Sequence, residues 1–596
     1  MGTQSAVRRA PSGEPLLPLL LVLFLFGAAA VVFAGLAAGW RLAGAPIEWN
    51  PVQAGIDLAM GQRSWPVQAT VLAPLFLAVY MFAILFAVVH RAGGRSHSVD
   101  AAARTMAPQQ QLRNVTGKRA AKTAARLAPA LTARDGKKAL PGLPLGHTVG
   151  KEMPLWMDWE SMAVCVAGQR TGKTTCYAIP ALMDAPGAVI ATSNKRDLHD
   201  ATRLHREQTG TVWLMDLQAV TGRAHVTFWW NPLTLVRTVE DARSLASYFA
   251  AASRQDTSRV DSYFDGGAEG LLWLYMLAAA TAGGDLIHVF TWLHHDQDDT
   301  PAVLLDHAGH ALPAMRVRVA QGLNDRQRDG LFDMARKLLE GLLSTAQADV
   351  ITPPSRVDIK VSGGHPLIRH LPPAHERPEF DPSGFAASTD TLYVLSVEGG
   401  DSADALTTAL VGQVLDCARK TSSACPGGRL PIPMVGVLDE AANIVKIRDL
   451  PKWYSHFGSR GILLMTFIQS RDQAELVWGR DETKALINGA ISIYGGNVRD
   501  TTYLEDLSRR IGEHDVAVSS RSVSAHGGGW QQSWKRERIM PIEELGALPR
   551  DRAIIELPGH APVLAAKVSW QQTQHKDAIV QSLRVYGETA ANGGVS

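Results

Sequence analysis

Cysteine is scarce in this chain, and the few cysteines stand apart from one another. The 596 residues include only four, Cys165, Cys176, Cys417 and Cys425, and no two of them form a Cys-x-x-Cys pair. This spacing argues against redox or metal sites built on such a pair and indicates reduced structural thiols. Net charge is also nearly absent, because 59 Lys and Arg against 57 Asp and Glu give only +2. Any contact with a polyanion must therefore be local.

Charged residues are missing altogether from two long stretches near the start of the chain. Neither residues 15–40 nor residues 64–90 contain a formally charged side chain. An apolar helix of about 20 residues can cross a hydrocarbon layer of about 30 Å. We therefore expect a membrane domain over residues 1–91, with transmembrane helices at about 16–40 and 68–90. A signal peptide for the first run and a buried core helix for the second are the alternatives.

The charges that flank the two runs predict their topology. Arg8 and Arg9 precede the first run, and Arg91 and Arg95 follow the second, whereas the connecting segment 41–64 balances two arginines against two carboxylates. The positive-inside rule then places both termini in the cytoplasm and a short loop outside.

Positive charge gathers just after the second run. Between residues 104 and 138, nine Lys or Arg stand against a single carboxylate, Asp135. Next to a membrane, such a stretch most often binds anionic lipid headgroups. Contact with a nucleic-acid backbone and a plain solvated linker are the alternatives. We assign residues 92–150 to a basic juxtamembrane linker.

Near-continuous apolar runs recur after residue 150. Such runs, separated by helical stretches, are typical of parallel strands buried on both faces of a sheet. The expected strands are residues 162–168, 187–193, 210–217, 391–397, 434–440, 461–469 and 491–496. The pattern predicts the α/β fold class, with a doubly wound sheet domain over residues 151–235 and 351–575.

One region breaks this alternation. From about residue 236 to residue 350 the pattern is helical throughout, which predicts an all-α domain inserted between two strands of the sheet. Residues 353–385 contain seven prolines and are expected to form a loop-rich return to the sheet. Residues 576–596 are expected to form a C-terminal tail.

The segment AGQRTGKTT, residues 167–175, matches a phosphate-binding loop at every position but one. Ala167 stands where the pattern has its first Gly. The segment follows an expected strand and opens a helical stretch, so its backbone N–H groups would surround phosphates at a helix N-terminus. Lys173 would contact the β- and γ-phosphates, and the Thr174 hydroxyl would ligate Mg²⁺. The residues expected to bind a nucleotide here are Gly168, Gln169, Arg170, Thr171, Gly172, Lys173, Thr174 and Thr175.

Two later strands end in residues that would complete such a site. The run MVGVLDEA ends in Asp439 and Glu440. Asp439 can hold Mg²⁺ through water, and Glu440 can orient or deprotonate an attacking water. Gln469 ends the strand GILLMTFIQ and could sense a γ-phosphate, because ligands of open α/β sheets lie at the carboxyl ends of the strands.

A basic residue is also expected to act on the transition state. Arg460 is the candidate arginine finger, able to neutralise charge on the transferring phosphate from a neighbouring subunit. Arg499, in the segment GGNVRD, is the alternative.

The whole set of motifs resembles the coupling proteins of type IV secretion and bacterial conjugation. The resemblance rests on the two N-terminal apolar runs and on segments found in the family's order: AGQRTGKTT, SNKRDL (193–198), WNPL (230–233), LDEAANI (438–444), SRGILLMTFIQS (459–470) and GGNVRDTTYLEDLSRRIG (495–512). It implies a RecA-like P-loop motor with a smaller all-α domain, at the inner membrane and assembled as a homo-hexamer. It also implies ATP and Mg²⁺ as cofactors, and as partners DNA (single-stranded, with a relaxase) and the proteins of a type IV secretion channel.

Other functions remain open at this point. A coupling ATPase for protein substrates alone would carry the same motor. A membrane-tethered docking receptor that binds nucleotide without hydrolysing it would not need Glu440. A chromosome-partitioning DNA pump is disfavoured by the helical insertion and the short membrane segment.

Overall fold

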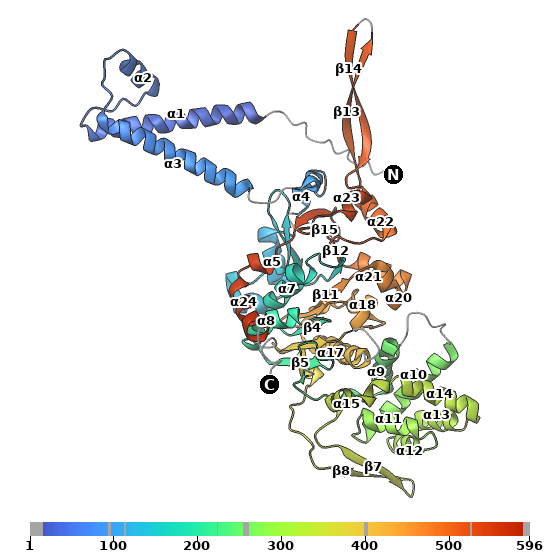
Figure 1. Ribbon diagram of the computed structural model, residues 1–596. Coiled ribbons are helices and arrows are strands. Elements are labelled where there is room, and N and C mark those ends of the chain that lie inside the picture. Colours follow the sequence, from blue (N-terminus) through green and yellow to red (C-terminus); the bar gives the residue numbers. More distant parts are fainter. Residues whose placement is uncertain are drawn as a thin grey trace. The chain divides into compact units, whose positions relative to one another are not determined.

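The computed structural model describes residues 16–92, 97–112, 115–222, 225–253, 262–397, 403–524 and 527–587. Two compact units divide the chain (Figure 1). The first comprises the chain up to Ala101 together with His514–Glu537, and the second comprises Ala102–Glu513 and the residues from Arg538 onward.

Two long apolar helices dominate the first unit. They are α1 (Leu16–Leu42) and α3 (Val67–Ala92), with the short helix α2 (Pro51–Ala59) between them. Both long helices are apolar enough to cross a membrane, as expected from the missing charges. In the second part of the unit, β13 (Glu513–Ser524) and β14 (Gly527–Arg538) pair into a two-stranded ribbon.

Small residues bring α1 and α3 into backbone contact. A Cβ atom added at Gly35 would lie 2.6 Å from Ala73 Cα, and one added at Gly39 would lie 2.7 Å from Ala69 Cβ. Glycines four residues apart thus face alanines four residues apart, the arrangement that allows transmembrane helices to approach closely.

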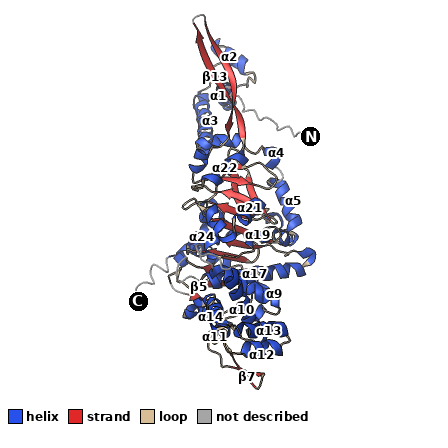
Figure 2. Ribbon diagram, turned by 90° about the vertical axis from the view of Figure 1, so that its right-hand side faces the viewer, coloured by secondary structure: helices blue, strands red, loops and turns tan. Residues whose placement is uncertain are grey.

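A twelve-stranded sheet forms the centre of the second unit, with helices on both faces (Figure 2). Its order is β2-β1-β16-β15-β12-β3-β11-β10-β4-β9-β5-β6. The strands are β1 (Gly142–Thr148), β2 (Pro154–Asp158), β3 (Ala163–Val166), β4 (Val189–Ser193), β5 (Val212–Asp216), β6 (His225–Val226), β9 (Thr391–Leu395), β10 (Met434–Leu438), β11 (Ile462–Ile468), β12 (Ile491–Tyr494), β15 (Arg552–Glu556) and β16 (Val563–Ala566).

The run of strands from β12 to β5 is parallel throughout, and each of these strands lies in one of the seven apolar runs singled out in the sequence. The predicted α/β sheet is therefore confirmed. Antiparallel strands extend it at both ends, with β15, β16, β1 and β2 beyond β12, and β6 beyond β5. These flanking strands were not expected: β1 and β2 contain Gly or Pro, and β6, β15 and β16 are only two to five residues long.

Helices cover both faces of this sheet. Side chains of α5, α6, α7, α8 and α24 share a buried core with one face, and α18, α20 and α21 pack against strands of the sheet outside that core. The helices around the sheet are α4 (Gln109–Leu112), α5 (Gly117–Leu127), α6 (Pro129–Asp135), α7 (Ile179–Asp184), α8 (Asp197–Glu207), α16 (Pro382–Phe385), α17 (Asp404–Ala424), α18 (Ala441–Ile444), α19 (Leu450–Trp453), α20 (Arg471–Trp478), α21 (Arg480–Gly489), α22 (Thr501–Ile511), α23 (Ile542–Gly546) and α24 (Lys576–Ser582).

The sheet domain extends beyond both boundaries expected from the sequence. β1 lies inside the segment assigned to the juxtamembrane linker, where α5 and α6 also bury Leu127 and Leu131. At the other end, α24 packs against α8 and buries Ile579, although this segment was expected to belong to a tail. Both segments are short and carry their few apolar residues at core positions, so composition alone does not reveal them.

A helical region is inserted between β6 and the return to β9. Its helices are α9 (Val239–Ser253), α10 (Ser262–Thr281), α11 (Leu286–His294), α12 (Thr300–His307), α13 (Ala311–Gln321), α14 (Asp325–Lys337) and α15 (Thr345–Ile351). The segment WNPL anchors its entry, since Trp230 Nε1 donates to Gln413 Oε1 (3.2 Å) and Asn231 Nδ2 donates to the Gly284 carbonyl (2.9 Å). The proline-rich return forms a hairpin of β7 (Val357–Ser362) and β8 (His365–His370).

One buried carboxylate joins this helical region to the hairpin. Asp285, 1% exposed, caps α11 and accepts two hydrogen bonds from Arg356, at 2.6 and 3.0 Å. Burial alone would raise the pKa of Asp285, but the contacts with His288 and Arg356 outweigh it and lower that pKa to about 2.

We predict that the substitution Gly39→Leu separates α1 from α3, because a side chain there meets the backbone of Ala69. Overpacking of this kind costs about 1–3 kcal/mol. The thermal midpoint of the protein in detergent measures it. Gly55→Leu is the matched control, because a Cβ atom at Gly55 has no neighbour within 4 Å. Equal midpoints for the two variants would contradict the close packing.

We predict that Asp285→Asn destabilises the protein at pH 7 by about 2 kcal/mol, the value of a pKa lowered by about two units. Because the folded pKa lies below the unfolded one, this stabilisation is complete above about pH 4 and is lost as the pH falls through the folded pKa. Urea unfolding from pH 7 to pH 3 should therefore show the difference from wild type shrinking below about pH 4. Asp325→Asn, at an exposed carboxylate, is the control, and a pH-independent difference would refute the linkage.

Candidate nucleotide site

The phosphate-binding loop lies between β3 and a helical segment, as the sequence predicts. The loop leaves β3 at Val166 and enters η3 (Thr174–Ala178), a π-helical turn that continues into α7. Arg170 (φ +58°) and Gly172 (φ +86°) take left-handed backbone conformations, and Thr171 Oγ1 donates to the Gly168 carbonyl at 2.8 Å. The backbone of the loop is thus tightly curved, which is the conformation in which successive N–H groups can bind one phosphate.

The neighbouring strand explains how Ala replaces Gly at the first position of the motif. Ala167 is fully buried, and a Cβ atom added at Gly495 would lie only 2.5 Å from its methyl group. A Cβ atom added at Gly168 would lie 1.9 Å from the Asn497 carbonyl oxygen. The segment that follows β12 therefore provides, at Gly495, the space that Ala167 needs.

Lys173, Glu440 and Gln469 meet at the carboxyl ends of three adjacent strands. Lys173 Nζ lies 3.3 Å from Glu440 Oε1, and Gln469 Nε2 donates to Glu440 Oε2 at 2.8 Å. Glu440 is only 8% exposed and has a left-handed backbone (φ +52°), which is uncommon for a residue other than Gly. Such strained residues cluster at functional sites. The structure thus brings together three of the residues singled out in the sequence.

Asp439 is buried beside this group and has an unused oxygen. It is 6% exposed, and within the described residues its Oδ1 has no hydrogen-bond partner. Burial raises the pKa of Asp439 to about 6; Lys173 opposes this, whereas Glu440 and Asp197 add to it. Together with the Thr174 hydroxyl at the start of η3, this carboxylate offers the oxygen donors that Mg²⁺ prefers, so these residues fit the ion.

Asp197, which the sequence analysis did not single out, belongs to the surroundings of this site. It is the first residue of α8, and its charge contributes to the raised pKa of Asp439. The sequence could have indicated Asp197 through its position in the segment SNKRDL, because that segment follows β4, and β4 is the neighbour of β10 in the sheet.

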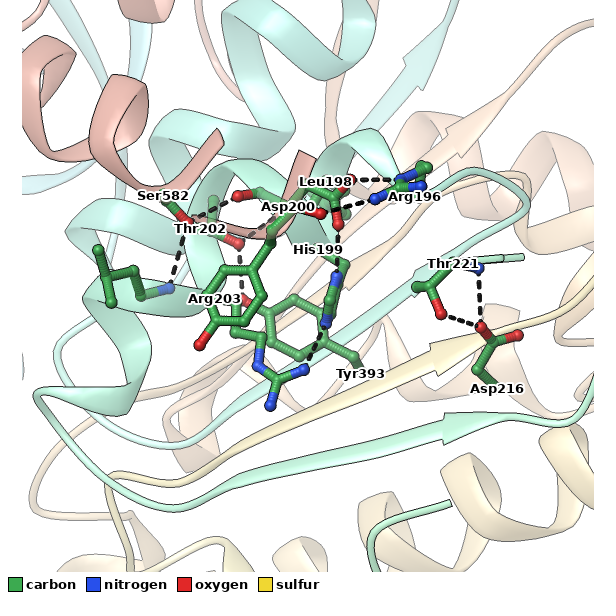
Figure 3. A network of polar contacts seen from close by, with 12 residues as sticks. Arg196, Leu198, His199, Asp200, Thr202, Arg203, Asp216, Thr221, Tyr393 and Ser582 are labelled. Atoms are coloured by element: carbon green, nitrogen blue, oxygen red, sulfur yellow. Dashed lines mark hydrogen bonds and ion pairs between the residues drawn. The ribbon is translucent and has the colours of Figure 1, made fainter. Parts of the chain in front are cut away.

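The C-terminal segment holds the start of α8 in place (Figure 3). Arg196 donates from Nε to Asp200 Oδ2 at 2.5 Å and from Nη2 to the carbonyl of Tyr586, in η9 (Leu583–Gly587), at 2.7 Å. Ser582 Oγ donates to the Asp200 carbonyl at 2.6 Å and accepts from the Leu204 N–H at 3.2 Å. The last helical turns of the described chain thus support the helix that carries Asp197.

Arg460, the first candidate finger arginine, is not part of this cluster. Arg460 precedes β11, at the opposite end of that strand from Gln469, and its Nη1 donates to Ser423 Oγ at 2.6 Å. Arg499 is exposed, two residues after Asn497. Within one chain, Arg460 therefore lies away from this cluster.

We predict that Gly495→Ala destabilises the second unit by about 1–3 kcal/mol, because the new methyl group meets that of Ala167. The double variant Ala167→Gly/Gly495→Ala should recover most of this loss, since it transfers the methyl group from one side of the contact to the other. A double-mutant cycle on the thermal midpoint measures the coupling. Additive effects of the two substitutions would contradict the compensation.

Comparisons with known proteins agree with this arrangement of motifs. The family described as "Type IV secretory system Conjugative DNA transfer" matches residues 110–303, and the family described as "TraM recognition site of TraD and TraG" matches residues 433–550. No curated protein matches the chain.

Several solved structures resemble the chain at low identity. The bacterial conjugative coupling protein TrwBdeltaN70, in an unbound monoclinic form, is 16% identical, with a TM-score of 0.48 over 75% of this chain and 92% of that one. The plasmid coupling protein TrwB in complex with ADP and Mg²⁺ is 16% identical, with a TM-score of 0.48 over 74% and 92%. VirB4 of Thermoanaerobacter pseudethanolicus is 11% identical, with a TM-score of 0.40 over 73% and 98%.

The two family matches bear directly on the residues of the site. The first includes the phosphate-binding loop, and the second includes Asp439, Glu440 and Gln469. Together the two matches cover just over half of the residues. The chain therefore belongs to the family of coupling proteins for conjugative DNA transfer by type IV secretion systems.

Proposed function

We propose that this protein is a membrane-anchored ATPase that uses ATP hydrolysis to bring relaxase-bound DNA to a type IV secretion channel and to move it there. The observation that carries the proposal is the shared carboxylate of Glu440, which Lys173 and Gln469 both contact beside the buried Asp439. A site that only bound nucleotide would need Lys173 but not a carboxylate placed to act on water.

ATP binding would rearrange this cluster. Lys173 would leave Glu440 Oε1 for the β- and γ-phosphates, because a phosphate carries more charge than one carboxylate. The loop N–H groups of residues 168–175 would donate to the phosphate oxygens. Mg²⁺, held by Thr174 and Asp439, would neutralise charge on the phosphate oxygens. The plasmid coupling protein TrwB has been solved in complex with ADP and Mg²⁺, which supports a nucleotide and Mg²⁺ as the ligands of this site.

Hydrolysis would then depend on Glu440 and Gln469. Glu440, released from Lys173, accepts a hydrogen bond from a water and takes its proton as the water oxygen attacks the γ-phosphorus. The bond from that phosphorus to the β–γ bridging oxygen breaks, and ADP and inorganic phosphate result. Gln469, already hydrogen-bonded to Glu440, would report whether the γ-phosphate is present.

A hexamer would place a neighbouring subunit's arginine near this site. We assign that role to Arg460, with Arg499 as the alternative, because Arg460 lies at the opposite end of β11 from Gln469 and Arg499 is exposed. Hydrolysis would in this way be coupled to motion between subunits.

Membrane anchoring by α1 and α3 would place both termini in the cytoplasm, as the flanking arginines predict. The basic helix α5 supports a charged contact there, since it exposes Lys118, Lys122 and Arg126 along one face and buries Ala120 and Ala124 on the other. Anionic lipid headgroups are the first candidate for this face and a DNA backbone the second.

We predict that Lys173→Ala abolishes nucleotide binding, whereas Glu440→Gln retains binding and lowers kcat by about 10²–10⁴-fold, because it removes the general base. The measurement is the ATPase rate of the full-length protein in lipid nanodiscs, with and without single- or double-stranded DNA. Glu482→Gln, at an exposed carboxylate of α21, is the control.

The DNA dependence separates the proposed function from its rivals. Turnover that DNA stimulates, and that Lys173→Ala abolishes, supports the DNA motor. Turnover that depends on Lys173 but is indifferent to DNA favours a coupling ATPase for protein substrates. A hexameric protein that binds ATP without hydrolysing it would be a docking receptor and would overturn the proposal.

A further inference from the structure

A buried lysine lies directly behind the phosphate-binding loop. Lys567 follows β16 and is only 7% exposed. Its ammonium group donates to three backbone carbonyls, those of Gly495 (2.7 Å), Thr171 (2.8 Å) and Arg550 (3.1 Å). Three N–H donors are all that a lysine has, so the group is fully used.

Burial makes this ammonium costly. Burial lowers the pKa of Lys567, and the neighbouring Cys165, Cys176 and Asp551 only partly oppose that effect. Among the described residues, no carboxylate is hydrogen-bonded to it. An apolar side chain would fill the same space without this cost. The reason for a lysine at this position must therefore lie in the three backbone segments that its hydrogen bonds join, those of Thr171, Gly495 and Arg550.

The bond to Thr171 orients a phosphate-binding donor. The described chain has no cis peptide bonds, so the Thr171 carbonyl and the Gly172 N–H point in opposite directions within the plane of their shared peptide. An ammonium group that holds the carbonyl from behind directs the Gly172 N–H away from Lys567. It also polarises that peptide and places a positive charge close to the loop, both of which favour an anion.

The other two bonds tie the loop to neighbouring strands. Gly495 follows β12 and Arg550 precedes β15, and these strands pair with each other in the sheet. Two further hydrogen bonds join the loop to the same place, from the Gly168 N–H to the Gly496 carbonyl (3.0 Å) and from Asn497 Nδ2 to the Gln169 carbonyl (3.0 Å). The rear of the loop is thus fixed at three of its residues, Gly168, Gln169 and Thr171.

We propose that Lys567 is a positioning residue of the nucleotide site, which holds the Thr171–Gly172 peptide so that its N–H faces the phosphates. The proposal rests on the proposed function, because it concerns the same site. Lys567 touches neither the nucleotide nor the metal ion, and it acts through the loop alone.

The test measures how tightly the full-length protein in detergent binds ADP with Mg²⁺, by isothermal titration. Lys567→Met should weaken binding on the order of tenfold, the value of lost hydrogen bonds to a charged group. Lys567→Arg, which keeps the charge and the donors, should lose less than Lys567→Met. In ATP hydrolysis, the KM of Lys567→Met should rise by a similar factor with kcat changed by less than about threefold, since the loop holds ground state and transition state alike.

Controls separate this proposal from simple destabilisation and from failure of the proposed function. Arg552→Met removes another buried cation nearby, one that donates to Asp551. It should lower the thermal midpoint without changing ADP affinity, and an equal loss of affinity would overturn the proposal. Wild-type affinity in Lys567→Met would overturn it as well. Lys567→Gln is the second neutral variant, and if neither neutral variant folds, Lys567 is structural and the proposal fails. Wild-type binding that Lys173→Ala leaves unchanged would instead refute the nucleotide site itself.

Discussion

Two adjacent carboxylates held at the buried edge of a sheet, next to a single ammonium group, are the constraint on which this structure depends. Asp439 and Glu440 are each less than a tenth exposed, and within the described residues the close positive charge beside them is that of Lys173. A pair like this is expensive to bury. It persists because three parallel neighbours, β3, β11 and β10, deliver the ammonium, the amide of Gln469 and the carboxylates to one place.

Much of this arrangement was readable from the sequence, for a physical reason. Strands buried on both faces are apolar along their whole length, so the sequence predicts β3, β10 and β11. Because the carboxyl ends of parallel strands lie at one edge of the sheet, the polar residues that follow these strands are expected to lie close together. The flanking strands β1 and β16 carry no such mark, because β1 contains two Gly and one Pro, and β16 is only four residues long. Their pairing is decided by contacts that no local pattern encodes.

The parts of the site that escaped prediction are those built from distant partners. Lys567 contacts a loop almost four hundred residues earlier in the chain, and one lysine in a polar stretch resembles any other. Ala167 appeared as a departure from a motif, whereas in the structure it is half of a pair whose other half is Gly495. A motif describes one segment of the chain, whereas this contact depends on two segments, those of Ala167 and Gly495.

The docking of the C-terminal segment on α8 has a consequence for the order in which the protein is made. The apolar helices α1 and α3 are synthesised before β16, Lys567 and the turn that receives Arg196. A nascent chain already inserted in the membrane would still lack the rear support of its phosphate-binding loop. Until synthesis passes Tyr586, both α8 and the phosphate-binding loop lack these contacts.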